Sequence, residues 1–344
     1  MITLDGSYGE GGGQIIRYAV ALSVLTQKPI TINNIRAKRP IPGLRPQHFT
    51  AISCMAELCD AEVKGLSVDS KKLIFIPNEI KPKKFKFDIG TAGSIPLIYQ
   101  AFILSSLHTS QPIVLELIGG TDVKWAPSWD YFAQVYIPLL QKMGITCQAY
   151  LERRGYYPKG GGKAVLTLQP TQTLHLPKHS DDLQPTHIDG IIHTSGLSDH
   201  ISKRIHHAAT KTIIQHNITA SLKIEKASSA SPGTGITLWT STNENLLGRA
   251  VLGEKGFPAE QVGTKAAQQL FQEMQATATF DVYAFDQLLP YLLLCKENYE
   301  GRLLHLSNHA KTTMWLLHHF FDFDIQLTET EKNLQFSIQK NTFK

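Results

Sequence analysis

The amino-acid sequence predicts a mixed α/β (α+β) fold of three repeated β-α-β-α-β-β modules, with a smaller α/β domain inserted in the third repeat. Glycine-rich turns lie between a predicted strand and a predicted helix at residues 9–13 and again at 90–94. The same order of elements surrounds each turn, and a repeat of roughly 80 residues suits a duplicated α/β module rather than a solenoid. Apolar residues make up 42% of the 344 residues, which is enough for a large core and excludes disorder.

The first module covers about residues 1–80. Short apolar stretches with turn residues on either side predict its strands, and longer apolar runs after a glycine loop or before a proline-rich loop predict its helices. The predicted strands are 2–4, 30–37, 61–68 and 72–77, and the predicted helices are 14–25 and 46–59.

The second module covers about residues 81–170. Residues 84–89 alternate between apolar and polar side chains, which is typical of a strand with one buried face. The glycine turn at 90–94 then opens a helix that reaches about residue 108. The remaining predicted elements are a strand at 113–118, a helix at 129–143, and strands at 145–151 and 163–168.

The third module is split by an insertion. Its second half is predicted as helix 285–295, strand 303–306, helix 309–320, and strands 324–328 and 334–338. Its first strand is predicted at 187–194 or at 173–176. The segment between has a polar start and a stretch rich in serine, glycine and proline, so we expect a core domain of residues 1–180 and 277–344 and an inserted small α/β domain at 181–276.

Composition limits the classes of protein that fit. Lys plus Arg is 34 and Asp plus Glu is 29, so the formal charge is 34 − 29 = +5, which permits an anionic partner without demanding one. No apolar run approaches the ~18 residues of a membrane span, and the N-terminus lacks the pattern of a signal peptide. The four cysteines are scattered, which indicates small core residues rather than a zinc site or a disulfide framework. We expect a cytoplasmic protein with no membrane segment and no obligate protein partner.

The first glycine loop, Gly9 to Gly13, is a candidate ligand site. A glycine-rich loop before a helix lets a ligand approach the backbone and directs N–H groups at anions. The loop contains neither a Walker motif nor a dinucleotide fingerprint, because Gln14 stands where a last glycine would be needed. Glu10 within the loop indicates a bridging divalent cation beside phosphates. The alternative is a tight turn that needs positive φ angles.

Two further segments carry candidate functional residues. A proline-stiffened loop at 36–48 holds five basic side chains just before a helix, which favours anion binding, although a solvated charged loop has the same composition. Ser307 or Asn308 can cap the helix in which His309 occupies the first turn. The positive end of that helix disfavours imidazolium and predicts a neutral, nucleophilic His309, but local sequence does not separate it from His305. Asp286 is a candidate metal ligand or a helix-start carboxylate.

Seven motifs in order resemble those of the RNA 3′-terminal phosphate cyclase family, and the resemblance extends over essentially the whole chain. The motifs are Asp5-Gly6 with Gly9 to Ile15 and Arg17; Arg36, Arg39, Pro42-Gly43-Leu44 and Gln47-His48; Gly90 with Ala92-Gly93-Ser94; Gly119 to Asp122 with Ala126-Pro127 and Asp130-Tyr131; Tyr156, Pro158 and Gly160 to Gly162; Asp286-Gln287; and His309 with Thr312. Any one motif is weak, whereas their joint order is specific.

The resemblance implies an ATP-dependent enzyme of the nucleotidyl-transfer (ligase) type that takes part in RNA processing. ATP adenylylates a histidine and releases pyrophosphate, AMP passes to an RNA 3′-phosphate, and the vicinal 2′-OH displaces AMP to give a 2′,3′-cyclic phosphate. The partner is therefore an RNA end that carries a 3′-phosphate, and the cofactors are ATP and Mg²⁺ or Mn²⁺.

The resemblance also implies residue roles. His309 matches the catalytic nucleophile, and Glu10 and Asp286 match metal-contacting carboxylates. The nucleotide-binding positions are Gln14, Gln100, Pro127, Tyr131, Tyr283, Asp286 and Gln287. The contacts for phosphate or the RNA terminus are Arg17, Arg39, Arg45, Gln47 and His48.

Two alternatives to an active cyclase fit parts of the sequence. The family has a non-catalytic branch that acts in ribosomal RNA processing and departs from the histidine pattern, which this chain retains. Enolpyruvyl transferases use a similar repeated module, but the H-x-x-T motif and the Glu10 loop favour the cyclase. The stretch 123–125 and Trp129 depart from the family pattern, which puts the nucleotide preference in question more than the reaction class.

Overall fold

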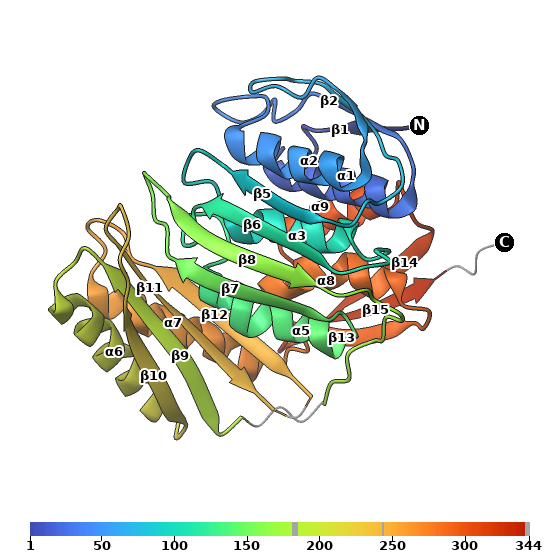
Figure 1. Ribbon diagram of the computed structural model, residues 1–344. Coiled ribbons are helices and arrows are strands. Elements are labelled where there is room, and N and C mark those ends of the chain that lie inside the picture. Colours follow the sequence, from blue (N-terminus) through green and yellow to red (C-terminus); the bar gives the residue numbers. More distant parts are fainter. Residues whose placement is uncertain (181–184, 243, 341–344) are drawn as a thin grey trace.

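Three small sheets with a common strand order build the core of the protein (Figure 1). The structure is a computed structural model, and it describes residues 1–180, 185–242 and 244–340. The first sheet has the order β1-β2-β4-β3 and the second the order β5-β6-β8-β7, so corresponding strands occupy corresponding places. In both sheets the first pair of strands is parallel and the other pairs are antiparallel. The predicted fold class and its repeat are confirmed.

The elements of the first two modules follow the predicted order. The first module contains β1 (Ile2–Asp5), α1 (Gly13–Thr26), β2 (Ile30–Asn33), α2 (Pro46–Cys59), β3 (Glu62–Lys64) and β4 (Leu73–Ile76). The second contains β5 (Lys84–Asp88), α3 (Ile95–Ser105), β6 (Ile113–Gly119), a helical segment of α4 (Trp129–Tyr131), a π-helical turn (Phe132–Tyr136) and α5 (Ile137–Lys142), then β7 (Cys147–Arg153) and β8 (Gly162–Leu168). The second strand ends earlier than predicted, because Asn34 and Arg36 adopt positive φ angles that turn the chain out of the sheet.

The third module contains α8 (Val282–Leu294), β13 (Tyr299–Leu303), α9 (Asn308–Leu317), β14 (Phe323–Glu329) and β15 (Leu334–Lys340). Its sheet has the order β13-β15-β14, which matches the second, fourth and third strands of the other modules. The strand predicted at 303–306 lies earlier, because Tyr299 to Leu303 pair with β15 and the apolar residues after them form a loop.

The predicted first strand of the third module is wrong. Residues 187–194 belong to β9, which pairs with β10 and β11 in a separate sheet, and residues 173–176 form no strand. The position beside β13 is taken by the short segment 276–281, in which the Thr279 N–H donates to the Arg302 carbonyl oxygen at 2.8 Å. That segment joins α7 directly to α8, and its residues adopt turns and bends rather than a strand.

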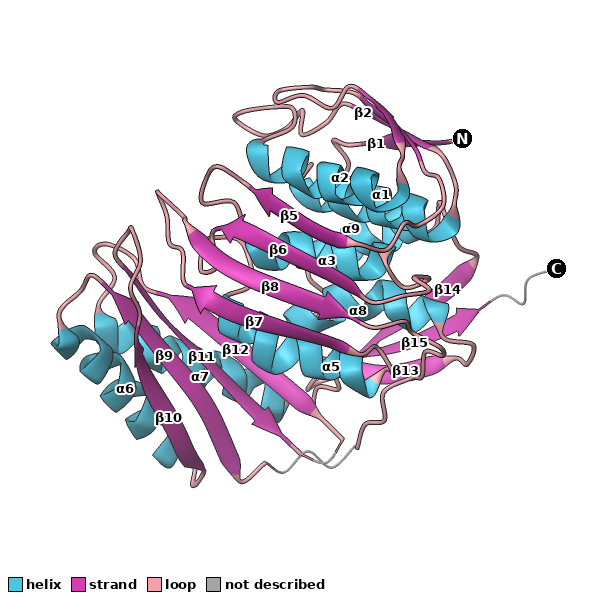
Figure 2. Ribbon diagram, in the orientation of Figure 1, coloured by secondary structure: helices cyan, strands magenta, loops and turns pink. Residues whose placement is uncertain are grey.

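The remaining elements form a separate sheet with two helices (Figure 2). They are β9 (His187–Ser195), α6 (Asp199–Ile214), β10 (Thr219–Lys226), β11 (Gly233–Ser241), β12 (Leu246–Leu252) and α7 (Ala259–Gln275). The strand order is β10-β9-β11-β12, and both helices pack on this sheet. Their buried residues make a hydrophobic core distinct from the one shared by the three modules. We infer that these elements are the inserted domain; its predicted start at 181, like residues 341–344 of the core domain, lies outside the described residues.

Helices from different modules meet in the shared core. Helix α1 contacts α2, α3 and α9, and α3 also contacts α8 (Figure 1). Residues 14 to 25 of α1 are all buried, which explains why this helix is apolar on every side rather than along one stripe. The four cysteines are buried and free. None of the helices in the described ranges is long and apolar enough to cross a lipid bilayer.

Candidate active site

A cavity of about 670 Å³ lies where helices of all three modules face the inserted domain. Its size falls in the range of about 300–1,000 Å³ that is typical of small-molecule sites. Every residue predicted to bind nucleotide lines this one cavity, and so does His309. The residues thus brought together from distant parts of the chain are Gln14, Gln100, Pro127, Tyr131, Tyr283, Asp286, Gln287 and His309.

The N-terminus of α9 anchors the predicted carboxylates. Ser307 is the N-cap: its hydroxyl accepts from the Ala310 N–H at 2.8 Å and donates to Asp286 Oδ2 at 3.2 Å. The next residue, Asn308, donates from Nδ2 to Glu10 Oε1 at 3.2 Å. Two carboxylates from different modules are therefore bonded to neighbouring residues at the start of the helix that carries His309.

Gln14 fixes the orientation of His309. Its Nε2 donates to the His309 carbonyl oxygen at 3.1 Å and to Thr313 Oγ1 at 2.6 Å, so its Oε1 must be the atom that lies 2.6 Å from His309 Nδ1. Because an amide oxygen can only accept, Nδ1 carries the proton and Nε2 keeps its lone pair. The imidazole is thus held in the tautomer that has a nucleophilic Nε2.

The surroundings of His309 favour the neutral ring. Burial lowers the pKa of His309 below its ordinary value, and the charges of Arg17 and Arg39 add to this while Glu10 opposes it. The sequence also predicted a neutral His309, but from the positive end of its helix, whereas the structure gives burial and the two arginines as the causes. A neutral imidazole near pH 7 can attack an electrophile without first losing a proton.

Arg17 and Arg39 lie close to these groups. Arg17 is buried, lines the cavity, and has no carboxylate partner in the part of the chain that the structure describes. Arg39 Nη2 lies 3.3 Å from Glu10 Oε2. A Cβ on Gly12 would lie 3.2 Å from Arg39 Nη2, so the glycine loop allows a close approach of this side chain. An unpaired buried guanidinium beside a nucleophile suits a phosphate group.

The other three residues predicted to contact anions have structural partners. Arg45 Nη1 lies 2.7 Å from Asp69 Oδ1, and the Gln47 side chain accepts from the Ser94 N–H at 2.8 Å, which joins α2 to the second glycine turn. His48 Nδ1 accepts from the Arg45 N–H at 3.1 Å. Burial lowers the pKa of His48 to about 3, with a further contribution from nearby arginines, so His48 is neutral. These residues shape the loops around the cavity.

The predicted nucleotide positions differ in how they are held. Gln100 Nε2 donates to Gln287 Oε1 at 2.5 Å, and the buried Tyr131 hydroxyl donates to Asp281 Oδ1 at 2.7 Å. Tyr283 is 45% exposed, and the Arg249 guanidinium carbon lies 4.6 Å from the centre of its ring. Tyr283 is therefore the tyrosine that is free to stack on a ligand.

Sequence reasoning missed the wall that the inserted domain contributes. Ala250 to Leu252, Glu254 and Phe257, with Lys265 and Gln269 of α7, line the same cavity. Asp281, the N-cap of α8, was also missed, although it accepts from the Tyr283 and Ala284 N–H groups, both at 3.0 Å. Helix α8 begins at Val282, three residues before the helix predicted at 285–295, and Asp281 directly before it was a readable capping signal. The wall residues share no local pattern.

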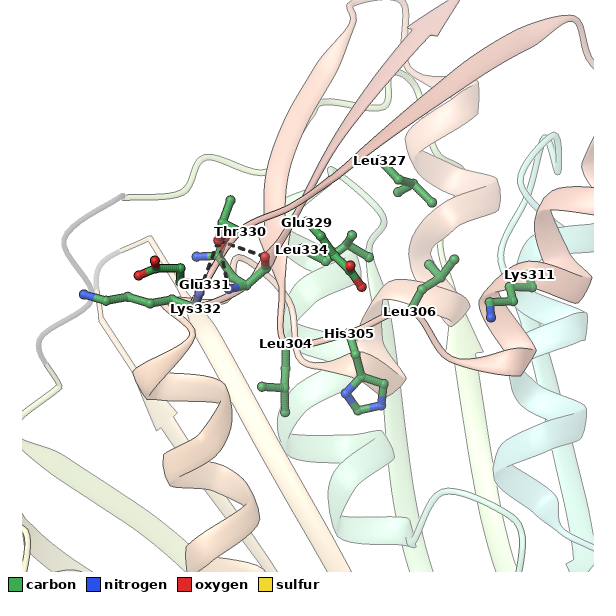
Figure 3. Close-up of a pocket in the computed structure, with 11 residues that line it drawn as sticks. Leu304, His305, Leu306, Lys311, Leu327, Glu329, Thr330, Glu331, Lys332 and Leu334 are labelled. Atoms are coloured by element: carbon green, nitrogen blue, oxygen red, sulfur yellow. Dashed lines mark hydrogen bonds between the residues drawn. The ribbon is translucent and has the colours of Figure 1, made fainter.

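His309 and His305 line different cavities, so the structure distinguishes the two candidate histidines. His305 lines a second cavity, of about 580 Å³, between the start of α9 and the β14–β15 turn (Figure 3). There it lies beside Leu304 and Leu306, while the Thr330 hydroxyl closes the turn on Asn333. Neither Glu10 nor Asp286 lines that second cavity. The geometry therefore favours His309 as the reactive histidine.

Asp286 and Glu10 are the carboxylates near the start of α9 that could hold a divalent cation. Asp286 is 7% exposed, and the Ser307 hydroxyl is its partner among the described residues. Burial raises the pKa of Asp286 well above its ordinary value. Glu10 supplies a second, exposed carboxylate, and carboxylate oxygens are the ligands that Mg²⁺ and Mn²⁺ prefer.

The cavity is large enough for a nucleotide, and His309, Asp286 and Arg17 line it together. Such an arrangement on repeated α/β modules is typical of an enzyme that acts on phosphate groups. Comparisons with known proteins identify its family. A sequence model of the family described as RNA 3′-terminal phosphate cyclase matches residues 8–327. The RNA 3′-terminal phosphate cyclase of Pyrococcus abyssi is 40% identical over 331 residues, which cover 94% of this chain and 95% of that protein. The protein of the same name from Methanococcoides burtonii is 40% identical over 339 residues, covering 98% of this chain and 100% of that protein. The chain belongs to the RNA 3′-terminal phosphate cyclase family, as its motifs predicted.

Proposed function

We propose that the protein converts an RNA 3′-terminal phosphate to a 2′,3′-cyclic phosphodiester at the expense of ATP. The observation that carries the proposal is the pair of hydrogen bonds between Gln14 and His309, because it leaves Nε2 free for covalent catalysis. The retained family motifs and the nucleotide-sized cavity support the choice of ATP and RNA as substrates.

In the first step His309 Nε2 attacks the α-phosphorus of ATP. A bond forms between Nε2 and phosphorus, the bond from the α-phosphorus to the bridging oxygen breaks, and pyrophosphate leaves. The ring becomes cationic as it attacks, and Gln14 Oε1 stabilises that charge through the Nδ1–H. Arg17, which lines the cavity and has no carboxylate partner among the described residues, would bind the phosphates.

Glu10 and Asp286 would hold the divalent cation, which neutralises phosphate charge when it is bound. The positions of Ser307 and Asn308 orient these two carboxylates toward the start of α9. Tyr283, the exposed tyrosine of the cavity, would stack on the adenine or ribose.

Two further transfers complete the reaction. An oxygen of the RNA 3′-phosphate attacks the phosphorus held by His309 and restores the neutral imidazole, which gives an RNA capped with AMP. The terminal 2′-OH then attacks the capped phosphorus, and AMP leaves as the ring closes. AMP is needed because a phosphate monoester alone has a poor leaving group.

Labelling with α-³²P-ATP tests the first step. Incubation with Mg²⁺ or Mn²⁺ is expected to give a protein label that is acid-labile and alkali-stable, as a phosphoramidate is. His309→Ala should abolish the label, while His305→Ala should retain it. An unlabelled wild type would overturn the cyclase proposal, and full labelling of His309→Ala would overturn the assignment of the nucleophile.

A modified RNA end tests the last step. RNA with a 3′-phosphate on a terminal 2′-deoxyribose lacks the attacking hydroxyl, so the AMP-capped RNA should accumulate. Efficient release of AMP with a cyclic product from this RNA would contradict attack by the 2′-OH.

A further inference from the structure

A buried charged cluster joins the second module to the inserted domain. Arg154 directly follows β7, and its side chain is 1% exposed. It donates to Asp122 Oδ2 at 3.1 Å, to Asp130 Oδ1 and Oδ2 at 2.8 and 3.0 Å, and to Glu225 Oε1 and Oε2 at 2.8 and 2.9 Å. Asp122 and Asp130 belong to the second module, whereas Glu225 lies on β10 of the insertion. We call Arg154 with these three carboxylates the Arg154 cluster.

A second contact supports the same junction. His193 of β9 is the cross-strand neighbour of Glu225, and its Nδ1 lies 2.8 Å from the Tyr156 hydroxyl. Its Nε2 lies 3.4 Å from Asp122 Oδ1. Asp122, Asp130 and His193 bring their ligand atoms within 4.8 Å of one another, a spacing that would also suit a metal ion. Arg154 already occupies both Asp130 oxygens and one oxygen of Asp122, so we take the guanidinium to be the cation of this cluster.

Two residues of the cluster flank a loop that lines the 670 Å³ cavity described above. Asp122 and Asp130 stand on either side of residues 123–128, which we call the nucleotide loop, and all six of its residues line the cavity. Asp122 Oδ1 also accepts from the Trp129 N–H at 3.1 Å, which closes the loop on itself. Both ends of the loop are therefore fixed by carboxylates that Arg154 holds.

The insertion contacts the nucleotide loop directly as well. The Ser128 hydroxyl lies 2.9 Å from the Thr237 hydroxyl of β11, and Lys124 Nζ lies 2.6 Å from Glu254 Oε2. The same domain supplies the cavity wall that carries Phe257, Lys265 and Gln269. A shift of the insertion relative to the second module would therefore move both sides of this end of the cavity.

We propose that Arg154 and Glu225 are positioning residues for ATP, and that the inserted domain serves to fix the nucleotide loop through them. The inference rests on the proposed function, since it assigns this end of the cavity to the nucleotide. The catalytic groups Gln14, Arg17 and His309 lie on α1 and α9 of other modules and make no contact with the Arg154 cluster among the hydrogen bonds and ion pairs of the described residues. The cluster should consequently affect nucleotide affinity and leave the chemical step intact.

Glu225→Gln is the central test. The Glu225 side chain is 36% exposed, so the variant is expected to fold, and the substitution keeps its volume while removing the charge that Arg154 binds. A change that reaches a binding site indirectly typically alters affinity by about 5- to 150-fold, so we expect a rise of about tenfold in KM for ATP. The value of kcat and the KM for RNA 3′-phosphate should stay within about twofold. Arg154→Lys, which keeps the charge and loses the fork geometry, should raise KM for ATP at least as much.

Glu260→Gln is the matched control. Glu260 of α7 binds Arg204 of α6 with both carboxylate oxygens, so the same substitution removes a similar ion pair within the insertion. This pair is exposed, and among the described residues it shares no hydrogen bond or ion pair with the nucleotide loop. KM for ATP should equal that of the wild type in this variant.

The outcomes separate this inference from the proposed function. Wild-type KM for ATP in Glu225→Gln, or the same rise in Glu260→Gln, would overturn the positioning role, and so would a fall in kcat with unchanged KM. Calorimetric titration with ATP and Mg²⁺ gives the same comparison without turnover, with about tenfold weaker binding expected in Glu225→Gln alone. A wild type that binds ATP but never forms the AMP label would refute the proposed reaction, while the titrations would still decide the role of the cluster.

Discussion

The role of Gln14 gives the sharpest prediction about catalysis. Gln14→Met has a similar volume but cannot accept from His309 Nδ1 or donate to the His309 carbonyl. The imidazole gains charge during attack, and a hydrogen bond to a charged group contributes about 1.5–3 kcal/mol. Since about 1.36 kcal/mol corresponds to a factor of ten in rate, the adenylylation rate should fall by about 10- to 150-fold.

The assay is a single-turnover measurement of protein labelling with α-³²P-ATP at saturating nucleotide, followed by rapid quenching. Thr313→Val is the matched control, because it removes the 2.6 Å hydrogen bond from Gln14 Nε2 while the His309 carbonyl still holds the amide in place. Because this hydrogen bond does not change as the imidazole gains charge, the control should label within about fivefold of the wild-type rate. Labelling of Gln14→Met at the wild-type rate would refute the argument that Gln14 selects the tautomer of His309.

Three further predictions concern stability and the metal. The pKa of His48 is about 3 in the folded protein against an ordinary 6.5. The contribution of neutral His48 to the free energy of unfolding is therefore complete above pH 6.5 and falls by about 1.4 kcal/mol per pH unit between pH 6.5 and 3. Urea unfolding should show a free energy about 2 kcal/mol lower at pH 5 than at pH 8, and His48→Gln should remove this difference. Asp286→Asn should raise the Mg²⁺ or Mn²⁺ concentration needed for half-maximal labelling about tenfold, and an unchanged metal titration would contradict its role as a ligand. A Cβ on Gly13 would overlap the His48 imidazole, so Gly13→Ala should lower the free energy of unfolding by about 3 kcal/mol. Gly161→Ala, with open space around it and φ of +70°, should lower it by about 1 kcal/mol, and equal losses would refute the steric argument.

The repeat was predictable because it rests on short-range signals. Glycine turns, capping residues such as Ser307, and apolar stretches all act within a few residues, so the order of elements in the first two modules followed from the sequence. The prediction of the first strand of the third module was wrong because local signals do not identify the partners of a strand. Residues 187–194 carry a strong strand pattern, and nothing local shows that their hydrogen bonds go to β10 and β11 rather than to β13.

Part of the candidate site was likewise predictable from the sequence, and part of it was not. The order of the motifs assigned His309, Gln14 and Asp286 to one site, and all three line one cavity in the structure. The Gln14 amide contacts and the wall formed by Phe257 and Lys265 depend on how separate elements pack, so no local pattern could supply them. Arg154 stood beside a recognised motif without an assigned role, because its three carboxylate partners come from two domains.

The hydrogen bond between Gln14 and His309 joins residues that lie 295 positions apart in the chain. During synthesis the glutamine therefore leaves the ribosome long before the histidine, and the two meet only when α9 docks on α1. A fragment that ends before this docking has no oriented imidazole and no capped helix start. Because this contact closes late, a partly made chain does not yet hold the imidazole of His309 in the orientation that the proposed reaction needs.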